Sequence, residues 1–311
     1  MPRSIIRTLM RGQPPARRLF IPLIFTLAAK LEDIALPTFL TNPTKIANAL
    51  TAIHYRLHTD GVVGYYDLTL VAEALGCRLD WHTVPPGIAA PRAVEIMGNM
   101  QLSPYELKNR GRIPVALDVV RRLHMTLRDE SALLVGLPGP LRLAQQLFGN
   151  DFAGRFAAGD SDTGDIFDTL TEMILHLSQA FCLAGTHLVL VDEAAIPASV
   201  LRRWESAMVP LWNAIRFHEA LPVLRTDTVI QARDLAEGPL LCQKPGQRNE
   251  SPLLEHSFAL ALPIAEALPV DITRWVSANN CVLITTDGEI PYQMEIQNLQ
   301  RVIAEMRSIL T

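Results

Sequence analysis

Acidic side chains directly follow several short apolar runs of the sequence, and they are the residues best placed to do chemistry. The runs are brief and aliphatic, as buried parallel strands are. The carboxylates that follow them are Asp67, Asp192, Glu193, Asp227 and Asp287. We expect these side chains to converge where the strands end. Neighbouring carboxylates raise one another's pKa and suit general acid–base catalysis, and their oxygens also bind hard cations such as Mg²⁺.

Arg225 lies two residues before Asp227 and is the natural counter-ion of this acidic group. His82 belongs to a long, proline-containing segment, residues 81–112, which we expect to pass over the catalytic end and bring the imidazole to the cleft. The predicted site therefore has two sets of residues. The catalytic set is Asp67, Asp227 and Asp287, and the substrate-binding set is Arg225, Asp192, Glu193 and His82.

Each of these residues also has an ordinary structural interpretation. Asp67 could cap the helix that follows it, and Asp192-Glu193 could cap the helix that begins near residue 197. Arg225 and Asp227 could form a structural ion pair, and Asp287 could support the turn at the next residue. The sequence leaves both interpretations open at each position.

The elements that must position these residues alternate along the chain. Strands are predicted at residues 22–25, 61–66, 132–135, 187–191, 223–225, 240–243 and 281–285. Helices are predicted around residues 5–10, 42–58, 114–127, 141–148, 165–184, 197–217 and 296–310. This alternation favours parallel strands joined by helices, and seven or eight such units in 311 residues indicate an α/β fold, a closed (β/α)8 TIM barrel. We expect residues 1–311 to form one domain with an N-terminal extension over about residues 1–20.

The composition excludes several classes of protein. Lys plus Arg is 28 and Asp plus Glu is 32, so the chain lacks the basic excess of a nucleic-acid-binding protein.

Arginines before the apolar residues 19–29 resemble the start of a signal peptide, but two prolines among them favour a buried first strand. No apolar run reaches the roughly 20 residues that span a membrane. The four cysteines contain no CxxC pair, which argues against a cysteine-rich zinc module and for a reducing cytoplasm.

Three segments carry a resemblance to a known family. The first runs from Asp60 to Cys77 and ends in AEALGC; the second is GRIPV at residues 111–115, leading to GLPGP at 136–140; the third is DGEIPY at 287–292. In this order and spacing they resemble the uroporphyrinogen decarboxylase superfamily. The first two are most similar to its corrinoid-dependent branch, the methylcobalamin:coenzyme M type of methyltransferase. The resemblance implies a distorted (β/α)8 barrel with its site at the carboxyl ends of the strands.

The resemblance also implies which metal ligands to look for. Zinc-dependent members of this branch bind zinc through a His-x-Cys pair after one strand and a cysteine near the last strand, and the metal turns an acceptor thiol into a thiolate. The matching positions here are Arg225, Asp227 and Asp287. No zinc of the family type is therefore expected.

The decarboxylase branch fits less well. Asp67 resembles its barrel aspartate, but its late histidine corresponds to Asp287, and its arginine-rich N-terminal pattern is absent. A porphyrinogen carries eight carboxylates and requires a strongly cationic cleft. Acidic residues at the cleft therefore disfavour true uroporphyrinogen decarboxylation.

These arguments predict a divergent corrinoid-linked methyltransferase. It would move a methyl group between a corrinoid carrier and a small acceptor without the family zinc, and Arg225 would hold an anionic part of the acceptor. Methylcobalamin would be bound on a separate carrier protein, because the Asp-x-His-x-x-Gly segment typical of carriers is missing. A homodimer is expected, with no membrane or nucleic-acid partner. One alternative is a non-catalytic relative that binds a corrinoid, a tetrapyrrole or a partner protein. Another is a decarboxylase of a small acid or a porphyrinogen, acting through Asp67.

Overall fold

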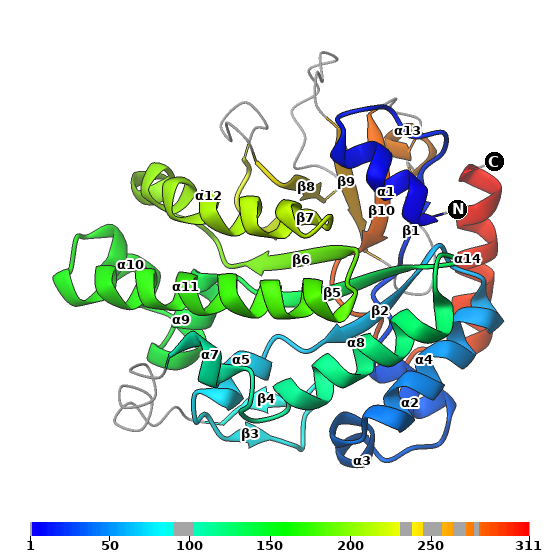
Figure 1. Ribbon diagram of the computed structural model, residues 1–311, viewed down its shortest axis with the longest axis horizontal. Coiled ribbons are helices and arrows are strands. Elements are labelled where there is room, and N and C mark those ends of the chain that lie inside the picture. Colours follow the sequence, from blue (N-terminus) through cyan, green and yellow to red (C-terminus); the bar gives the residue numbers. More distant parts are fainter. Residues whose placement is uncertain are drawn as a thin grey trace.

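The computed structural model describes residues 2–89, 103–230, 238–244, 257–263, 272–276 and 280–310. Its main sheet has eight parallel strands in the order β1-β10-β9-β8-β7-β6-β5-β2 (Figure 1). The strands are β1 (Leu19–Phe20), β2 (Gly61–Tyr66), β5 (Ala132–Pro138), β6 (Leu188–Glu193), β7 (Leu221–Thr226), β8 (Leu240–Gln243), β9 (Phe258–Leu262) and β10 (Cys281–Thr286). Nearly every strand residue is buried, which accounts for the aliphatic runs in the sequence. The fold is the predicted (β/α)8 barrel.

Helices surround this sheet (Figure 1). The longer ones are α1 (Pro2–Met10), α4 (Pro43–Leu57), α8 (Ile113–Leu127), α9 (Pro140–Phe148), α11 (Ser161–Ala184), α12 (Leu201–Phe217) and α14 (Ile296–Leu310). The shorter ones are α2 (Thr26–Leu31), α3 (Leu36–Thr41), α5 (Leu70–Ala74), α7 (Pro104–Leu107), α10 (Phe152–Ala157), α13 (Ile272–Val276) and the 3₁₀ turn η1 (Ala198–Val200). A small antiparallel pair, β3 (Leu79–Asp80) and β4 (Gly87–Ile88), lies outside the barrel. Within these described ranges, no helix combines the length and apolar character needed to cross a bilayer.

Local sequence explains where the helices begin. The side chain of Asn42 accepts a hydrogen bond from the backbone N of Lys45 at 3.0 Å, and Pro43 occupies the first turn of α4. Both choices favour a helix start, since the cap satisfies a free N–H and proline lacks one. The N-terminal helix α1 buries Ile5 and Ile6, so the predicted extension packs onto the barrel.

One strand prediction is wrong, and one strand of the main sheet is not predicted. The first strand is Leu19–Phe20 rather than residues 22–25, because Pro22 has no N–H to donate. The backbone N of Leu23 instead donates to Thr286 Oγ1 at 3.0 Å. Strand β9 was not predicted, because its sequence, FALAL, contains two alanines, which favour helices over strands. Its full burial between β8 and β10 overrides that preference.

The barrel closes in an unusual way between β1 and β2. No strand ladder joins these two described strands. Instead the carboxylate of Asp60 accepts a hydrogen bond from the backbone N of Phe20 at 2.9 Å, and the backbone N of Asp60 donates to the carbonyl of Phe20 at 3.1 Å. Arg17 donates to both oxygens of the same carboxylate, at 2.8 and 2.6 Å. The Asp60 side chain therefore accepts three hydrogen bonds at this seam, one from Phe20 and two from Arg17.

Candidate active site

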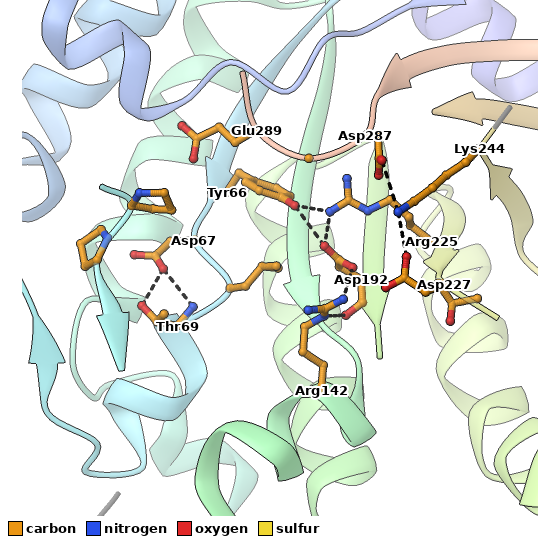
Figure 2. A pocket seen from close by; sticks show the side chains of 15 residues that line it. Tyr66, Asp67, Thr69, Arg142, Asp192, Arg225, Asp227, Lys244, Asp287 and Glu289 are labelled. Atoms are coloured by element: carbon orange, nitrogen blue, oxygen red, sulfur yellow. Dashed lines mark hydrogen bonds and ion pairs between the residues drawn. The ribbon is translucent and has the colours of Figure 1, made fainter. Parts of the chain in front are cut away.

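A cavity of about 460 Å³ opens where the strands end at their carboxyl side (Figure 2). Its volume lies within the usual range for sites of small molecules, roughly 300–1,000 Å³. The charged and aromatic residues that line it are Tyr66, Asp67, Arg142, Asp192, Arg225, Asp227, Lys244, Asp287 and Glu289. They come from the ends of β2, β6, β7, β8 and β10 and from the first turn of α9. The architecture thus brings together side chains that are far apart in the sequence.

A buried ion-pair cluster forms the floor of the cavity. Asp192 and Arg225 are register partners in the β6–β7 ladder, and the guanidinium Nη2 of Arg225 donates to Asp192 Oδ2 and to Tyr66 Oη. The Tyr66 hydroxyl donates to the same Asp192 oxygen at 3.1 Å, and Arg142 Nη2 lies 3.0 Å from Asp192 Oδ1. Burial, reinforced by the Asp192 carboxylate, raises the pKa of Tyr66, so its hydroxyl stays protonated at neutral pH.

Asp67 is fixed by a second set of contacts. Its Oδ1 accepts from the backbone N and the hydroxyl of Thr69, at 2.9 and 2.6 Å. Its Oδ2 accepts from Arg112 Nη1 at 2.7 Å, and Arg112 Nε donates to Glu73 at 2.7 Å. The Arg112 guanidinium also lies over the ring of Trp81, 5.4 Å from its centroid. These contacts hold Asp67 in one orientation at the cavity edge.

Lys244 bridges the two aspartates at the opposite side of the cavity. Its Nζ lies 2.7 Å from Asp227 Oδ1 and 3.2 Å from Asp287 Oδ2. The hydrogen bond between Lys244 and Asp227 lowers the pKa of Asp227 and raises the pKa of Lys244. Both groups are therefore charged at neutral pH. The ion pair between Arg225 and Asp227 considered from the sequence does not form; Arg225 contacts Asp192, and Asp227 contacts Lys244.

Glu289 differs from the other acids because only half of its carboxyl group has partners. Its Oε1 accepts from the backbone N of Thr26 and from the Thr26 hydroxyl, the latter at 2.6 Å. Its Oε2 is buried and has no hydrogen-bond partner in the described part of the chain. Burial raises the pKa of Glu289 to about 7, and the nearby charge of Asp67 acts in the same direction. A carboxyl group of this kind can exchange a proton at neutral pH.

Glu193 does not line the cavity. It is fully buried, and its two oxygens accept from three backbone N–H groups and from Trp204 Nε1, the last at 2.9 Å. Two of those N–H groups belong to the first turn of α9, so Glu193 caps that helix rather than the later helix near residue 197. Gly139 makes room for it, since a Cβ there would lie 2.4 Å from the Glu193 carboxyl carbon. Burial raises the pKa of Glu193 to about 7, and the four donors oppose that rise.

His82 is exposed beside the β3–β4 pair and does not line the cavity either. The same segment does reach the cavity, through Pro85 and Pro86. Residues 90–102 of the segment lie outside the described residues.

The cavity therefore gathers five of the seven predicted residues: Asp67, Asp192, Arg225, Asp227 and Asp287. Four further residues that the sequence does not predict line the same cavity: Tyr66, Arg142, Lys244 and Glu289. Tyr66 ends β2 and Lys244 directly follows β8, so uncharged and basic residues at strand ends carry a signal for these two. Glu289 lies three residues beyond β10, in the loop after Asp287. Arg142, in a helix, gives no such signal.

The described lining of the cavity contains no histidine or cysteine, the donors that the resemblance relates to zinc. In the part of the chain that is described, no group of three or more His, Cys, Asp or Glu side chains is placed to hold a metal. At the positions that the resemblance relates to zinc ligands, the Lys244 ammonium already lies between Asp227 and Asp287, and a divalent cation there would be repelled. None of the four cysteines lines the cavity, although Cys242 is the register partner of Arg225 in the β7–β8 ladder. All four are buried, and burial raises the pKa of Cys77 to about 11 and of Cys242 to about 12.

Comparisons with known proteins agree with this architecture. The sequence model described as uroporphyrinogen decarboxylase (URO-D) matches residues 1–215. A methylated-thiol–coenzyme M methyltransferase of Methanosarcina mazei is 25% identical over 141 residues, covering 44% of this chain and 37% of that protein. A methylcobamide:CoM methyltransferase, MtaA, of Methanosarcina barkeri is 26% identical over 168 residues, covering 52% of this chain and 49% of that protein. The chain thus matches half or less of the length of these relatives.

One solved structure has the same fold. A methyltransferase from Methanosarcina mazei superimposes with a TM-score of 0.79, covering 100% of this chain and 99% of that one. Its sequence identity is 17%, so the likeness concerns the fold alone.

Proposed function

Because the chain belongs to the uroporphyrinogen decarboxylase (URO-D) family, we propose that it is a corrinoid-linked methyltransferase that activates its acceptor without zinc. The partial matches to two coenzyme M methyltransferases support the reaction class. The observation that carries the zinc-free part is the placement of Lys244 between Asp227 and Asp287. The Lys244 ammonium group there occupies the place of the metal in the zinc-dependent branch and can donate a hydrogen bond to the acceptor.

The acceptor would be a small polar molecule with an anionic part. Arg142 and Lys244 line the cavity with partly exposed side chains, at 29% and 31%, and so can contact a ligand. Arg225 is 8% exposed and already contacts Asp192, so its part is to fix the floor of the cavity. This assigns the anionic end of the acceptor to Arg142 and Lys244 rather than to Arg225.

Glu289 would act as the proton acceptor. A methylcorrinoid on a partner protein supplies an electrophilic methyl group when it is bound. An acceptor heteroatom that bonds to the methyl carbon has to lose its own proton, and the carboxyl group of Glu289, which lines the cavity and has a pKa raised to about 7, can receive it. Thr26 holds one oxygen and so fixes the orientation of the carboxyl group. Asp67, fixed by Arg112, would orient the acceptor from the same side of the cavity.

The test is methyl transfer from free methylcobalamin to a panel of thiols, amines and tetrahydrofolate, with the methylated product measured by mass spectrometry. The proposal expects transfer that persists after treatment with a strong chelator. Transfer that the chelator abolishes and zinc restores would overturn the zinc-free mechanism. Absence of transfer to every acceptor, together with binding of a corrinoid or a corrinoid protein, would favour the non-catalytic alternative.

A further inference from the structure

A second cavity lies at the opposite end of the barrel, where the strands begin. It has a volume of about 80 Å³ and is lined by residues of α1, by His124 of α8, and by the connections that lead into β6 and β7. None of the residues that form the candidate active site contributes to it. A ligand of this second cavity would therefore not contact the residues of the proposed transfer reaction.

Three buried polar atoms of residues that line this cavity have no hydrogen-bond partner among the described residues: His124 Nδ1, Thr186 Oγ1 and His187 Nε2. Thr186 and His187 are 3% and 6% exposed. The backbone N of Leu133 donates to His187 Nδ1 at 3.0 Å, so the ring proton lies on Nε2 and this atom is a donor. The Thr186 hydroxyl can also donate, and so can His124 Nδ1 in one tautomer. A buried donor without an acceptor lowers the free energy of unfolding, and a ligand oxygen would satisfy each of these donors.

Two arginines and one glutamate, Glu219, are the charged residues that line the cavity, so positive charge is in excess. Arg3 and Arg7 of α1 line it. Their acidic partners, Asp129 at 2.6 Å and Glu219 at 3.6 Å, are 63% and 73% exposed and so are strongly screened by solvent. Each guanidinium has five N–H groups, so one such contact leaves others available.

The pKa of His187 responds to the same charges. Burial lowers the pKa of His187 to about 4, and Arg3, His124 and Arg7 lower it further, whereas Asp129 acts against them. His124 lies close by, with ring centroids 5.8 Å apart. It can do so because residue 185 is a glycine with φ +110°, where a Cβ would lie 2.4 Å from the His124 ring.

We propose that this cavity binds one small oxyanion of the size of inorganic phosphate, held by Arg3, Arg7, His124, Thr186 and His187. A single water needs roughly 10–15 Å³ of such volume, so the cavity has room for a tetrahedral anion. Water would satisfy the orphaned donors, whereas an oxyanion would also accept from guanidinium N–H groups of Arg3 and Arg7 that the single contacts with Asp129 and Glu219 leave available. The bound anion would join α1 to the base of the barrel.

The experiment is thermal denaturation of the full chain in inorganic phosphate and in chloride at equal ionic strength, with ³¹P line broadening as a direct measure of binding. We expect phosphate to raise the Tm by about 2 °C at saturation, and chloride to leave it unchanged. Arg7→Gln and Arg3→Gln should each remove the phosphate response. Arg202→Gln, which removes an exposed arginine with a surface partner, should keep it.

Two outcomes would overturn the proposal. Equal responses to phosphate and chloride, or none to either, would mean that the cavity holds water only. A phosphate response that survives Arg3→Gln and Arg7→Gln but disappears in Lys244→Met would assign the anion to the other cavity. Neither outcome depends on methyl transfer, so the test stands apart from the proposed function.

Discussion

Asp192 and Arg225 face each other across the β6–β7 ladder, and their charged groups meet inside the barrel. Both side chains are almost fully buried, so the register of two strands fixes the geometry of the pair. Tyr66 and Arg142 add contacts to the same carboxylate from β2 and α9. The floor of the candidate site is therefore part of the framework of the barrel.

Asp192→Asn should lower the free energy of unfolding by about 3 kcal/mol, because it leaves the Arg225 charge buried without its partner. Tyr66→Phe should lower it by about 1 kcal/mol through loss of the hydroxyl contacts. Urea denaturation monitored by circular dichroism measures the free energy of unfolding of both variants. An Asp192→Asn protein as stable as the wild type would show that solvent or the remaining hydrogen bonds compensate for loss of the carboxylate charge.

Lys244→Met should reduce kcat/KM for methyl transfer by about tenfold or more without unfolding the protein, because the carboxylates of Asp227 and Asp287 lose the cation between them. The matched control is Lys30→Met. Lys30 has nearly the same exposure, 32% against 31%, and its Nζ also lies 3.2 Å from a carboxylate, that of Glu295, but it does not line the cavity. Equal loss of activity in the two variants would remove Lys244 from the mechanism.

Glu289 should make the protein less stable as the pH rises. Its pKa is about 7 in the folded chain against an ordinary 4.5, so between these values the folded state holds a proton that the unfolded state has released. The stability that this proton contributes is complete below pH 4.5 and is lost as the pH passes 7. Glu289→Gln should remove this part of the pH dependence and stabilise the protein by about 2 kcal/mol above pH 7. The free energies of unfolding of the wild type and of Glu289→Gln are measured from pH 5 to 8. Their difference isolates the contribution of Glu289 from that of the other titrating groups.

The same variant should lose methyl transfer by about 10²-fold or more, because glutamine cannot accept a proton. Binding of the acceptor, measured by calorimetry, should change little. The wild-type rate should rise with pH through about 7, as Glu289 loses its proton, and this step should be absent in Glu289→Gln. Unchanged transfer in Glu289→Gln would assign proton transfer to another group.

Gly139→Ala should destabilise the protein by about 1–3 kcal/mol, because the new Cβ would overlap the carboxyl group of Glu193 that caps α9. Gly154→Ala is the control. Its Cβ meets nothing within 4 Å, and in helix α10 alanine is favoured over glycine. Its Tm should therefore stay the same or rise. A fall of similar size in both variants would contradict the close contact at Gly139.

The sequence predicts strand ends well, and with them five residues of the candidate site. It does not predict which charges pair, because pairing depends on the register between strands: Arg225 contacts Asp192, 33 residues away, rather than Asp227. It also does not reveal that Glu193 points away from the cavity while its neighbour Asp192 lines it. Successive residues of a strand point to opposite faces, and which one faces the cavity is set by the barrel as a whole.

The seam between β1 and β2 has a consequence for how the barrel comes apart. Every other pair of neighbouring strands shares at least two register positions, so separating them breaks a ladder. Separating β1 from β2 breaks no ladder among the described strands, only the backbone hydrogen bond from Asp60 to Phe20 and the contacts of the Asp60 carboxylate with Phe20 and Arg17. The ring should therefore become an open sheet first at this point, and the amide of Phe20 should exchange with deuterium earlier than the amides inside β5, β6 and β7.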